Sequence, residues 1–342
     1  MKVLIIKLSS IGDCVHTLPA LHALRKGLDK AGVKARIDWL VEEAASGVLK
    51  GNPLIDNLIV VKRGWAKNFG DNRKTARLLA STGYDMVLDF QGLLKSGVWV
   101  MLSRGKKRAG FSNGRELSHL FLNDRLPPYD IERHAVERYL DLAAHAGGDT
   151  SEVKFPLHIP KAFVESAIKK IEKGGIKKGS PFFVLIPRAR WETKLWDDGR
   201  FIELAKRVIS KSGIPAVLAG GPSDRAALEA IKEKIGEGAC NLSGQTDLLE
   251  LAAVLKMARF AVTVDSGPMH LAAAVGTRTV ALFGPTAPWR TGPYGKGHII
   301  VRKGLKCSPC FKKKCTDPKC MKEISVDDVM AAVEEVLKGD RA

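Results

Sequence analysis

Long apolar runs are absent from this sequence of 342 residues. The longest, such as Phe182–Ile186 and Val98–Leu102, fall far short of the ~20 residues that a membrane-spanning helix requires, so we expect no segment to cross a bilayer. Aromatic residues are also scarce, at 6% of the chain. This content is low for a protein that stacks nucleic-acid bases, and the basic residues are spread over nearly every predicted helix, so we expect no nucleic-acid partner.

Three signatures of nucleotide binding are missing as well. No GxGxxG follows a predicted strand, which argues against a dinucleotide-dependent oxidoreductase, and no GxxxxGK(S/T) occurs, which excludes a P-loop. No Asp-x-Asp triplet is present, so the chain lacks obvious ligands for a metal ion that clamps a diphosphate. A nucleotide bound here would have to be held by helix ends and by cationic side chains.

Positive charge is abundant, because 55 Lys and Arg residues against 37 Asp and Glu residues give a net charge of +18. A basic surface concentrates anionic ligands, lipid head groups or nucleic acid without choosing among them. At the start of the chain, KVLIIK ends at Lys7 and the polar stretch SSIGD, too early for a signal peptide. We therefore interpret this start as a strand and expect a cytoplasmic protein, in which stable disulfides are not expected.

Short apolar, β-branched runs alternate with amphipathic stretches, which is typical of βα units and a mainly parallel sheet. In the first half, strands are predicted at Val3–Lys7, Arg36–Val41, Leu58–Val61, Met86–Phe90 and Arg108–Phe111. In the second half, strands are predicted at Phe182–Ile186, Ala216–Ala219, Phe260–Val264 and Thr279–Phe283, with helices near 198–212, 223–235, 247–258 and 268–275. The expected fold class is α/β, with two Rossmann-like doubly wound domains.

Gly, Pro and Lys gather between residues 150 and 180, so we place the domain boundary there. The predicted division is an N-terminal domain over 1–165, a C-terminal domain over 166–325 and a closing segment over 326–342. The amphipathic helix of the closing segment is a candidate to cross back to the first domain. Ligands of open α/β sheets bind beyond the carboxyl ends of the strands, so two such domains suggest a site in a cleft between them.

The first predicted strand is followed by a turn of small residues that includes Ser10, Gly12 and Asp13. Small side chains let the backbone approach a ligand there. Ser10 or Asp13 can also cap the helix that follows, a role worth ~1 kcal/mol. Alternatively Asp13 acts as a general base, because a carboxylate at a strand end can accept the proton of an attacking hydroxyl. The residues leave both roles open.

Two turns in the second half point to an anion site. One of them joins a buried strand to a helix start, where Gly267 leaves N–H groups accessible to a phosphate. Asp265 and Ser266 in this turn either cap the helix or bind the ligand, and His270 is either a ligand group or a packed core histidine. The next strand ends in a turn at Thr286, and the two neighbouring turns suggest one nucleotide pocket.

The loop after Phe182–Ile186 brings cations to the same edge of the sheet, and it includes Ala189, Arg190 and Lys194. Lys194 is a candidate for neutralising a leaving diphosphate, because a fixed cation placed where charge develops stabilises a transition state by several kcal/mol. The alternative for Lys194 is a solvated loop lysine with no such role.

Four cysteines, Cys307, Cys310, Cys315 and Cys320, lie close together in a basic stretch near the C-terminus. Their density is that of a small tetrathiolate knuckle, although the spacings are shorter than those of common zinc ribbons. A structural zinc or iron ion is one interpretation, and reduced thiols or redox-sensitive disulfides are the others. A closed site of four thiolates has no open coordination position, so we expect no catalytic metal there.

Several segments together resemble one known family. They are KVLIIKLSSIGDCVHTLPAL at the start, DFQGLLKS at 89–96, HAVER at 134–138, TKLW at 193–196, VDSGPMHLAAAVG and FGPT. They are similar to the ADP-heptose:lipopolysaccharide heptosyltransferases of glycosyltransferase family nine, over most of the chain. The opening and the HAVER segment are more similar to the branch that adds the first heptose to Kdo-lipid A than to the branch that adds the second.

The resemblance implies a GT-B fold, with the acceptor in the first domain and the donor, ADP-heptose, in the second. It implies a single displacement with inversion, in which Asp13 is the base and no metal or other cofactor takes part in catalysis. The donor-binding positions that it implies are Lys194, Asp265, Ser266, Gly267, His270 and Thr286, with Ala189 and Arg190 where first-heptose enzymes carry paired threonines. The acceptor positions that it implies, for Kdo carboxylates and phosphate, are Ser10, Gly12, Lys62, Arg63, His134 and Arg138.

The alternatives are a GT-B transferase or an epimerase that uses another sugar nucleotide and, more remotely, a basic nucleic-acid-binding protein with a cysteine knuckle. A lipid-linked acceptor implies work at the anionic inner face of the inner membrane. The apolar and basic stretch at 93–108 either docks there as a peripheral helix or forms a core helix followed by a solvated loop.

Overall fold

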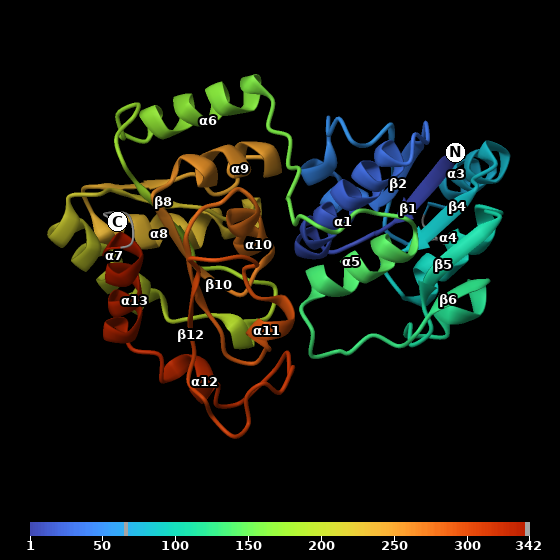
Figure 1. The fold of residues 1–342 in the computed structure, drawn as a ribbon. Coiled ribbons are helices and arrows are strands. Elements are labelled where there is room, and N and C mark those ends of the chain that lie inside the picture. Colours follow the sequence, from blue (N-terminus) through green and yellow to red (C-terminus); the bar gives the residue numbers. More distant parts are fainter. Residues whose placement is uncertain (65–67, 339–342) are drawn as a thin grey trace. The chain divides into compact units, whose positions relative to one another are not determined.

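The computed structural model describes residues 1–64 and 68–338, which divide after His158 into two compact units (Figure 1). The division falls inside the stretch rich in Gly, Pro and Lys in which we expected the boundary, a few residues before position 165. Each unit is built around one six-stranded parallel sheet.

The sheet of the first unit has the strand order β3-β2-β1-β4-β5-β6. Its strands are β1 (Lys2–Ile6), β2 (Arg36–Glu42), β3 (Asn57–Val61), β4 (Met86–Asp89), β5 (Lys107–Phe111) and β6 (Asp124–Leu126). Its helices are α1 (Ile11–Lys30), α2 (Glu43–Ser46), α3 (Phe69–Thr82), α4 (Leu94–Leu102) and α5 (Ala135–His145), with 3-10 turns η1 (Gly47–Leu49) and η3 (Ser118–Phe121).

Helices cover both faces of this sheet, which is why β1 is apolar on both sides and fully buried from Val3 to Ile6. Leu4 and Ile6 face the core under α3 and α4, together with Trp99 of α4. Helices α1 and α5 pack against each other on the opposite face (Figure 1). A Cβ at Gly27 would lie 2.1 Å from the Gly147 carbonyl oxygen, so this packing requires glycine near the end of α1.

The second unit repeats this arrangement, with the strand order β12-β11-β10-β7-β8-β9. Its strands are β7 (Phe183–Ile186), β8 (Ala216–Leu218), β9 (Ala239–Asn241), β10 (Phe260–Val264), β11 (Thr279–Leu282) and β12 (Ile299–Val301). Its helices are α6 (Lys161–Lys173), α7 (Asp198–Ser212), α8 (Arg225–Ile235), α9 (Leu248–Met257), α10 (Gly267–Ala274), α11 (Pro288–Thr291), α12 (Lys319–Lys322) and α13 (Val326–Lys338), with 3-10 turns η4 (Glu192–Lys194) and η5 (Pro222–Asp224).

When the strands of each unit are counted from its own first strand, β1 or β7, the two sheets have the same strand order. The prediction of two doubly wound α/β domains is confirmed. The order reverses between β1 and β4 in the first unit and between β7 and β10 in the second. Ligands of such sheets bind at this switch point, beyond the carboxyl ends of the strands. All nine predicted strands are present, and the structure adds β6, β9 and β12.

The closing helix α13 packs within the second unit. Its buried residues Val329, Val333 and Val336 belong to the same apolar core as Phe183 and Val262, and the helix lies against α7, β11 and β12. The apolar face that we considered for a return to the first domain is therefore covered by its own unit. Residues 339–342 of the expected closing segment lie outside the described residues.

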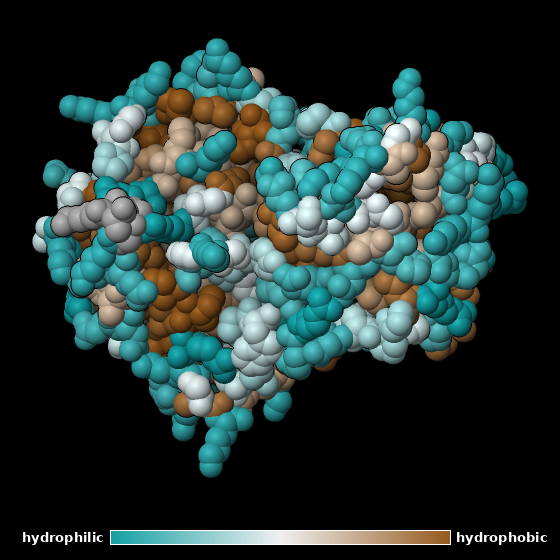
Figure 2. Space-filling view, viewed as in Figure 1, coloured by the Kyte–Doolittle hydropathy of each residue, from teal (hydrophilic) through white to brown (hydrophobic). Residues whose placement is uncertain are grey.

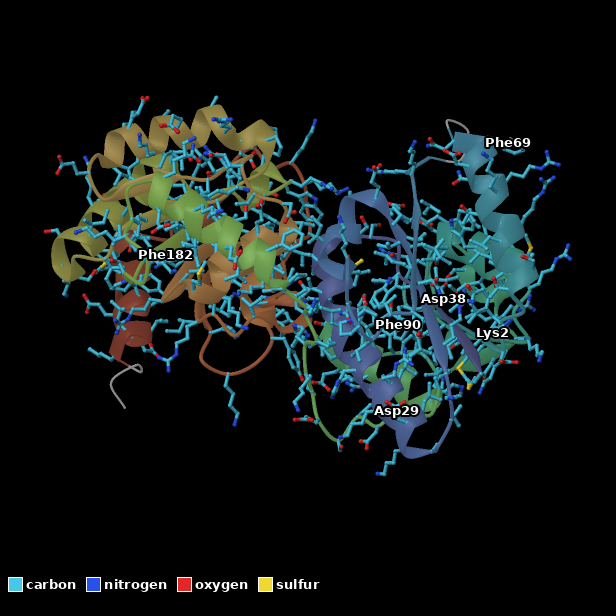
Figure 3. The ribbon with its side chains drawn as sticks, turned by 90° about the horizontal axis from the view of Figure 1, so that it is seen from above. Lys2, Asp29, Asp38, Phe69, Phe90 and Phe182 are labelled. Atoms are coloured by element: carbon cyan, nitrogen blue, oxygen red, sulfur yellow. The ribbon has the colours of Figure 1, made fainter. Side chains whose placement is uncertain are left out.

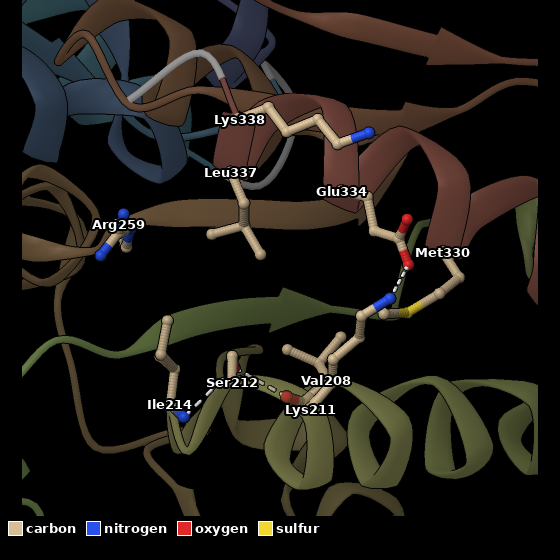
Figure 4. Close-up of a pocket in the computed structure, with 9 residues that line it drawn as sticks. All are labelled: Val208, Lys211, Ser212, Ile214, Arg259, Met330, Glu334, Leu337 and Lys338. Carbon is tan, nitrogen blue, oxygen red and sulfur yellow. Dashed lines mark hydrogen bonds and ion pairs between the residues drawn. The ribbon is translucent and has the colours of Figure 1, made fainter. Parts of the chain in front are cut away.

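A pocket of about 400 Å³ lies between α7 and α13 (Figure 4). Lys211 and Glu334 form an ion pair of 2.5 Å across it. The residues that line it are Val208, Lys211, Ser212, Ile214, Arg259, Met330, Glu334, Leu337 and Lys338. None of these residues lies on the loops that follow β7, β10 or β11, so this pocket is separate from the switch point of the second unit.

The stretch at 93–108 forms a core helix, as one of our two interpretations had it. Trp99 and Val100 of α4 are buried in the core of the first unit, while Leu94 and Met101 are about half exposed. The basic residues that follow are not all in a loop, because β5 begins at Lys107.

Candidate active site

The first turn of the first unit holds Asp13 beyond the carboxyl end of β1. Ser10 stands at the N-cap of α1, and its backbone N–H and its hydroxyl both donate to Asp13 Oδ2, at 2.9 and 2.8 Å. Gly12 is buried in the same turn. Asp13 therefore does cap its own helix, and the same two hydrogen bonds fix the position of its carboxylate.

A buried lysine lies next to this turn. Lys7 is 2% exposed, and its Nζ donates to the carbonyl oxygen of Phe90, labelled in Figure 3, at 2.8 Å and to the hydroxyl of Tyr139 at 2.6 Å. Burial lowers the pKa of the Lys7 ammonium, but Tyr139 and the Asp13 carboxylate outweigh it and raise the pKa above its ordinary value. The charged lysine in turn favours the ionised form of Asp13.

Residues from neighbouring strands hold the first turn in place. Gln91 Oε1 accepts hydrogen bonds from the backbone N–H groups of Leu8 and Ser9, both at 3.1 Å. Lys95 Nζ donates to Ser9 Oγ at 2.8 Å and pairs with Glu42 Oε1 at 2.7 Å. We did not predict a role for Lys7, Gln91 or Lys95. A lysine at the end of an otherwise apolar, buried strand was the available sign.

Two of the predicted acceptor residues lie at the start of α5. His134 is the N-cap of α5, where its Nδ1 accepts from the Val136 N–H at 3.2 Å, and its ring lies 5.1 Å from the ring of His16. His16 and Asp13 share one face of α1, because they are three residues apart. Arg138 stacks over the Tyr129 ring at 4.7 Å. The structure thus brings the start of α5 beside the turn that holds Asp13.

The other two predicted acceptor residues, Lys62 and Arg63, follow β3. Both are exposed, and Lys62 Nζ lies 3.9 Å from Asp71 Oδ2. Strand β3 is two strands from β1, which corresponds to ~10 Å across the sheet. No contact in the described part of the chain links Lys62 or Arg63 to Asp13, so their acceptor role stays a prediction.

In the second unit, the side chains of two predicted residues contact the same carboxylate oxygen of a third. Lys194 Nζ lies 2.6 Å from Asp265 Oδ2, and the Thr286 hydroxyl donates to the same oxygen at 2.6 Å. The side chains of Lys194 and Asp265 are only 16% and 6% exposed. The Lys194 ammonium also lies 4.6 Å from the centre of the Trp191 ring. Lys194 is therefore a fixed, partly desolvated cation and not a solvated loop lysine.

The start of α10 lies directly after Asp265. Ser266 occupies the N-cap position, but its side chain makes no capping hydrogen bond, and Gly267 is the first helical residue. The first N–H groups of α10 are thus not capped by Ser266, which suits a phosphate. The capping role considered for Asp265 and Ser266 is wrong for both side chains, because Asp265 is bonded to Lys194 and Thr286 instead. His270 is buried within the helix.

Two predicted donor residues stand apart from this group. Ala189 packs against the apolar core of the unit, and Arg190 is exposed. Neither makes a polar side-chain contact with Lys194, Asp265 or Thr286 in the described chain, and their donor-binding role stays a prediction.

The four clustered cysteines are free thiols of unequal exposure. Cys307 and Cys315 are exposed, Cys310 is half-buried and Cys320 is buried. Within residues 1–64 and 68–338, no group of three or more His, Cys, Asp or Glu side chains is arranged to hold a metal ion. Binding of a structural zinc or iron ion by these cysteines stays a prediction. The segment that carries them packs against neighbouring loops, as described below.

A sequence model of the family described as glycosyltransferase family 9 (heptosyltransferase) matches residues 72–321, a span that includes the second-unit site. The chain belongs to glycosyltransferase family 9. Among curated proteins, it is 33% identical to lipopolysaccharide heptosyltransferase 1 of Pseudomonas aeruginosa, over 92% of this chain and 88% of that one. It is 32% identical to the protein of the same name from Salmonella typhimurium, over 90% and 95% of the two chains.

Solved structures agree with this membership. The E. coli heptosyltransferase WaaC with ADP has a TM-score of 0.79 and 27% identity over 98% of this chain and 100% of that chain. A family 9 glycosyl transferase from Veillonella parvula has a TM-score of 0.83 at 24% identity over 98% and 97%, and this likeness shows the fold alone. This member of family 9 is thus a glycosyltransferase with the GT-B fold of the heptosyltransferases.

Proposed function

We propose that this glycosyltransferase transfers heptose from ADP-heptose to a Kdo-lipid A type acceptor in the inner core of lipopolysaccharide. Its similarity to proteins named heptosyltransferase 1 supports the acceptor, and its 26% identity to WaaC with ADP-2-deoxy-2-fluoro heptose, at a TM-score of 0.75, supports the donor. The observation that carries the proposal is the buried Lys194, Asp265 and Thr286 group beside the open start of α10.

The second unit supplies the donor side of this reaction. The diphosphate of ADP-heptose accepts hydrogen bonds from the N–H groups at Gly267 and lies against the positive end of the α10 dipole. Lys194 meets the charge that grows on the β-phosphate as the sugar leaves. Asp265 and Thr286 keep Lys194 in one position before the donor arrives, so that less reorganisation is required during the reaction.

The first unit supplies the base. Asp13 takes the proton of the acceptor hydroxyl, the acceptor oxygen forms a bond to the anomeric carbon, and the bond from that carbon to the β-phosphate oxygen breaks. ADP leaves with the bonding electrons, and the anomeric configuration is inverted because the acceptor oxygen attacks the face opposite to ADP. The Lys7 ammonium helps to keep Asp13 ionised between turnovers. His134 and Arg138, beside the same turn, bind the carboxylates or phosphate of the acceptor.

Protein groups supply the positive charge in this scheme, so the proposed transfer is independent of a metal ion. The test is a donor panel with purified protein and Kdo-lipid A: ADP-heptose is compared with ADP-glucose, UDP-sugars and GDP-sugars, each with and without EDTA. We expect transfer from ADP-heptose alone, unaffected by EDTA, with an inverted anomeric centre by NMR. Preference for a UDP- or GDP-sugar would favour the alternative transferase, and epimerised donor without transfer would favour the epimerase.

A lipid-linked acceptor also requires contact with the membrane. No helix in the described ranges is long and apolar enough to span a bilayer. Apolar residues nevertheless reach the surface in patches (Figure 2). Helix α4 and the turn η3 pack together and carry exposed apolar residues, namely Leu94, Met101, Leu117 and Leu120. Exposed basic residues flank them, namely Arg104, Lys106 and Arg115. This combination supports peripheral docking on the anionic inner leaflet of the inner membrane, from the cytoplasm.

The docking test uses vesicles of phosphatidylglycerol and phosphatidylcholine in a sedimentation assay. We expect binding that weakens with salt and that falls in the variant Leu117→Ser with Leu120→Ser. The matched control is Leu78→Ser, an exposed leucine on α3. Binding that is insensitive to salt, or equal losses in the control, would contradict docking through this surface.

A further inference from the structure

The cysteine-rich segment (residues 307–320) packs directly on the loops that carry the proposed donor site. The Pro285 carbonyl oxygen accepts hydrogen bonds from the backbone N–H groups of Cys310, at 3.0 Å, and Phe311, at 2.7 Å. The Ser308 hydroxyl donates to the carbonyl oxygen of Gly284 at 2.5 Å. These contacts hold the segment against the turn that contains Thr286.

The C-terminal end of the segment packs against the same turn. A Cβ at Gly284 would lie 2.6 Å from Met321 Sδ and 3.0 Å from Cys320 Sγ, so there is no space between this loop and the start of α12. On the other side, the buried hydroxyl of Thr193 donates to the carbonyl oxygen of Lys312 at 2.8 Å. The cysteine-rich segment therefore contacts both the loop that carries Lys194 and the loop that carries Thr286.

This packing brings a second ammonium group to the Trp191 ring. The nitrogen of Lys194 lies 4.6 Å from the ring centre and that of Lys313 lies 5.5 Å from it. Since both distances are measured to the same ring centre, the two nitrogens are at most about 10 Å apart. Unlike Lys194, Lys313 has no carboxylate within ion-pair distance in the described chain.

The charge balance of the site gives this lysine a role. Lys194 and Asp265 are one positive and one negative group 2.6 Å apart, so the pair has no net charge to set against a diphosphate. A diphosphate carries negative charge on both phosphates, and the charge on the inner one grows as the sugar departs. The dipole of α10 supplies only a fraction of a unit charge. A further cation close to the pair is therefore needed.

We propose that Lys313 is this second cation and that the cysteine-rich segment is a wall of the donor site, with the diphosphate of a nucleoside diphosphate sugar as its ligand. The inference rests on the proposed function, because it assumes a donor of this class. The segment has the structural task of presenting Lys313, through its contacts with Pro285, Gly284 and Thr193. Its cysteines need no metal ion for that task.

The experiment measures binding of ADP, AMP and adenosine by calorimetric titration to the wild type, Lys313→Met, Lys313→Arg and Lys314→Met. Lys314 is the matched control, because it is the next residue, is exposed and has no side-chain partner within residues 1–64 and 68–338. We expect Lys313→Met to weaken ADP binding about tenfold, with adenosine affinity unchanged, AMP affinity affected less and most of the loss recovered in Lys313→Arg. The Kd for ADP should also depend less on salt in Lys313→Met.

Two results would overturn the inference: ADP affinity in Lys313→Met equal to that of the wild type, or an equal loss in Lys314→Met. Circular dichroism and thermal unfolding show whether each variant is folded, which is expected for changes at exposed positions. Failure of the proposed function looks different, because the wild type would then neither bind ADP nor transfer heptose. A wild type that does both, with an unaffected Lys313→Met, contradicts only the role of Lys313.

Discussion

The two units have the same strand order, and in each a helix begins directly beyond a strand at the switch point: α1 after β1 in the first unit and α10 after β10 in the second. These two helix starts differ in their capping. In the first unit, Asp13 accepts a hydrogen bond from the Ser10 N–H, so an acidic side chain already occupies the start of α1. In the second, Ser266 makes no capping hydrogen bond and Gly267 opens α10. The two helix starts thus present a carboxylate in one unit and, in the other, N–H groups that Ser266 does not cap and that favour an anion.

The lysines beside these helix starts differ in a related way. Lys7 donates to the uncharged oxygens of Phe90 and Tyr139, and it also interacts electrostatically with the Asp13 carboxylate. Lys194 is paired directly with Asp265. The comparison teaches that topology sets where these side chains stand, whereas the partner of each lysine distinguishes the proposed base site from the proposed anion site.

The largest effect is expected for Asp13→Asn. A general base contributes ~10²–10⁴-fold, so kcat should fall by a factor in that range, while the Kd of ADP should stay unchanged because the proposed donor site lies in the second unit. Steady-state kinetics and calorimetric titration measure the two quantities. Ser10→Ala is the control: it removes one hydrogen bond to Asp13 but keeps the carboxylate, and should lose far less activity. Equal losses in kcat and ADP affinity would remove Asp13 from the base role.

Next in size is the pair Lys194→Met and Asp265→Asn. Each single change leaves a nearly buried charge without its partner and should reduce the free energy of unfolding by about 3 kcal/mol. The double variant should lose less than the sum of the two, and Lys194→Met alone should lower kcat by ~10²-fold. Urea denaturation and kinetics measure these effects.

The control for this pair is Lys106→Met, which breaks the exposed ion pair with Asp85 in the first unit and should leave stability nearly unchanged. Strict additivity of Lys194→Met and Asp265→Asn would show that the two side chains are not coupled in solution.

A smaller effect is expected for Lys7→Met, on the pH profile of kcat. The ammonium favours the ionised form of Asp13, so its removal raises the pKa of that carboxyl and moves the acidic limb of the profile to higher pH. Tyr139→Phe is the control, because it keeps the lysine. Burial raises the pKa of the Tyr139 hydroxyl, which therefore carries no charge in the working range.

Lys7 also interacts electrostatically with two other buried groups. Burial raises the pKa of Asp89, on β4, and burial raises that of Cys14, on α1, to about 12. Coincident profiles for the wild type and a folded Lys7→Met would show that the lysine is structural only.

The smallest effect concerns the start of α13 in the second unit, for Asp328→Asn. The Lys303 ammonium, which donates to Asp328, and the Ser325 backbone N–H lower the pKa of this carboxyl to about 2. Because the folded pKa is below the unfolded value, the stabilisation is complete above pH ~4 and is lost as pH falls towards 2. The side chain is one third exposed, so we expect a loss of only ~0.5–1 kcal/mol at pH 7.

Urea denaturation at pH 7 and at pH 2.5 measures this difference between the wild type and Asp328→Asn. The two proteins should converge at the lower pH, and a difference that grows on acidification would contradict the assignment. Lys303→Met is the matched variant, because it removes the cation and leaves the hydrogen bonds between Asp328 and Ser325 in place.

Most of the fold could be predicted because its central strands are continuous apolar runs between loops. The three strands that we did not predict, β6, β9 and β12, have three residues each and lie at the edges of the two sheets. An edge strand has one neighbour, and a run of three residues, even an apolar one such as Ile299–Val301, is too short to indicate a strand by itself. Its conformation depends on pairing with a strand that is distant in the sequence.

The site was predictable where residue type and place on the sheet were enough, as for Asp13, Lys194 and Asp265. The buried contacts of Lys7 were not, since its two partners lie 83 and 132 positions away. The packing of the cysteine-rich segment was not predictable for a similar reason. Its spacing did not indicate the hydrogen bonds to Pro285 and Thr193, which hold the segment against the loops that carry Thr286 and Lys194.

Local patterns of apolar and small residues were thus sufficient to establish two parallel sheets and the loops at their carboxyl ends. They carry this information because burial and strand period are properties of neighbouring residues. Which polar side chains meet there was decided by packing: Thr286 on Asp265, Lys95 on Ser9, and Lys313 on Trp191. Such contacts join distant parts of the chain, and only the folded backbone brings them within a few ångströms.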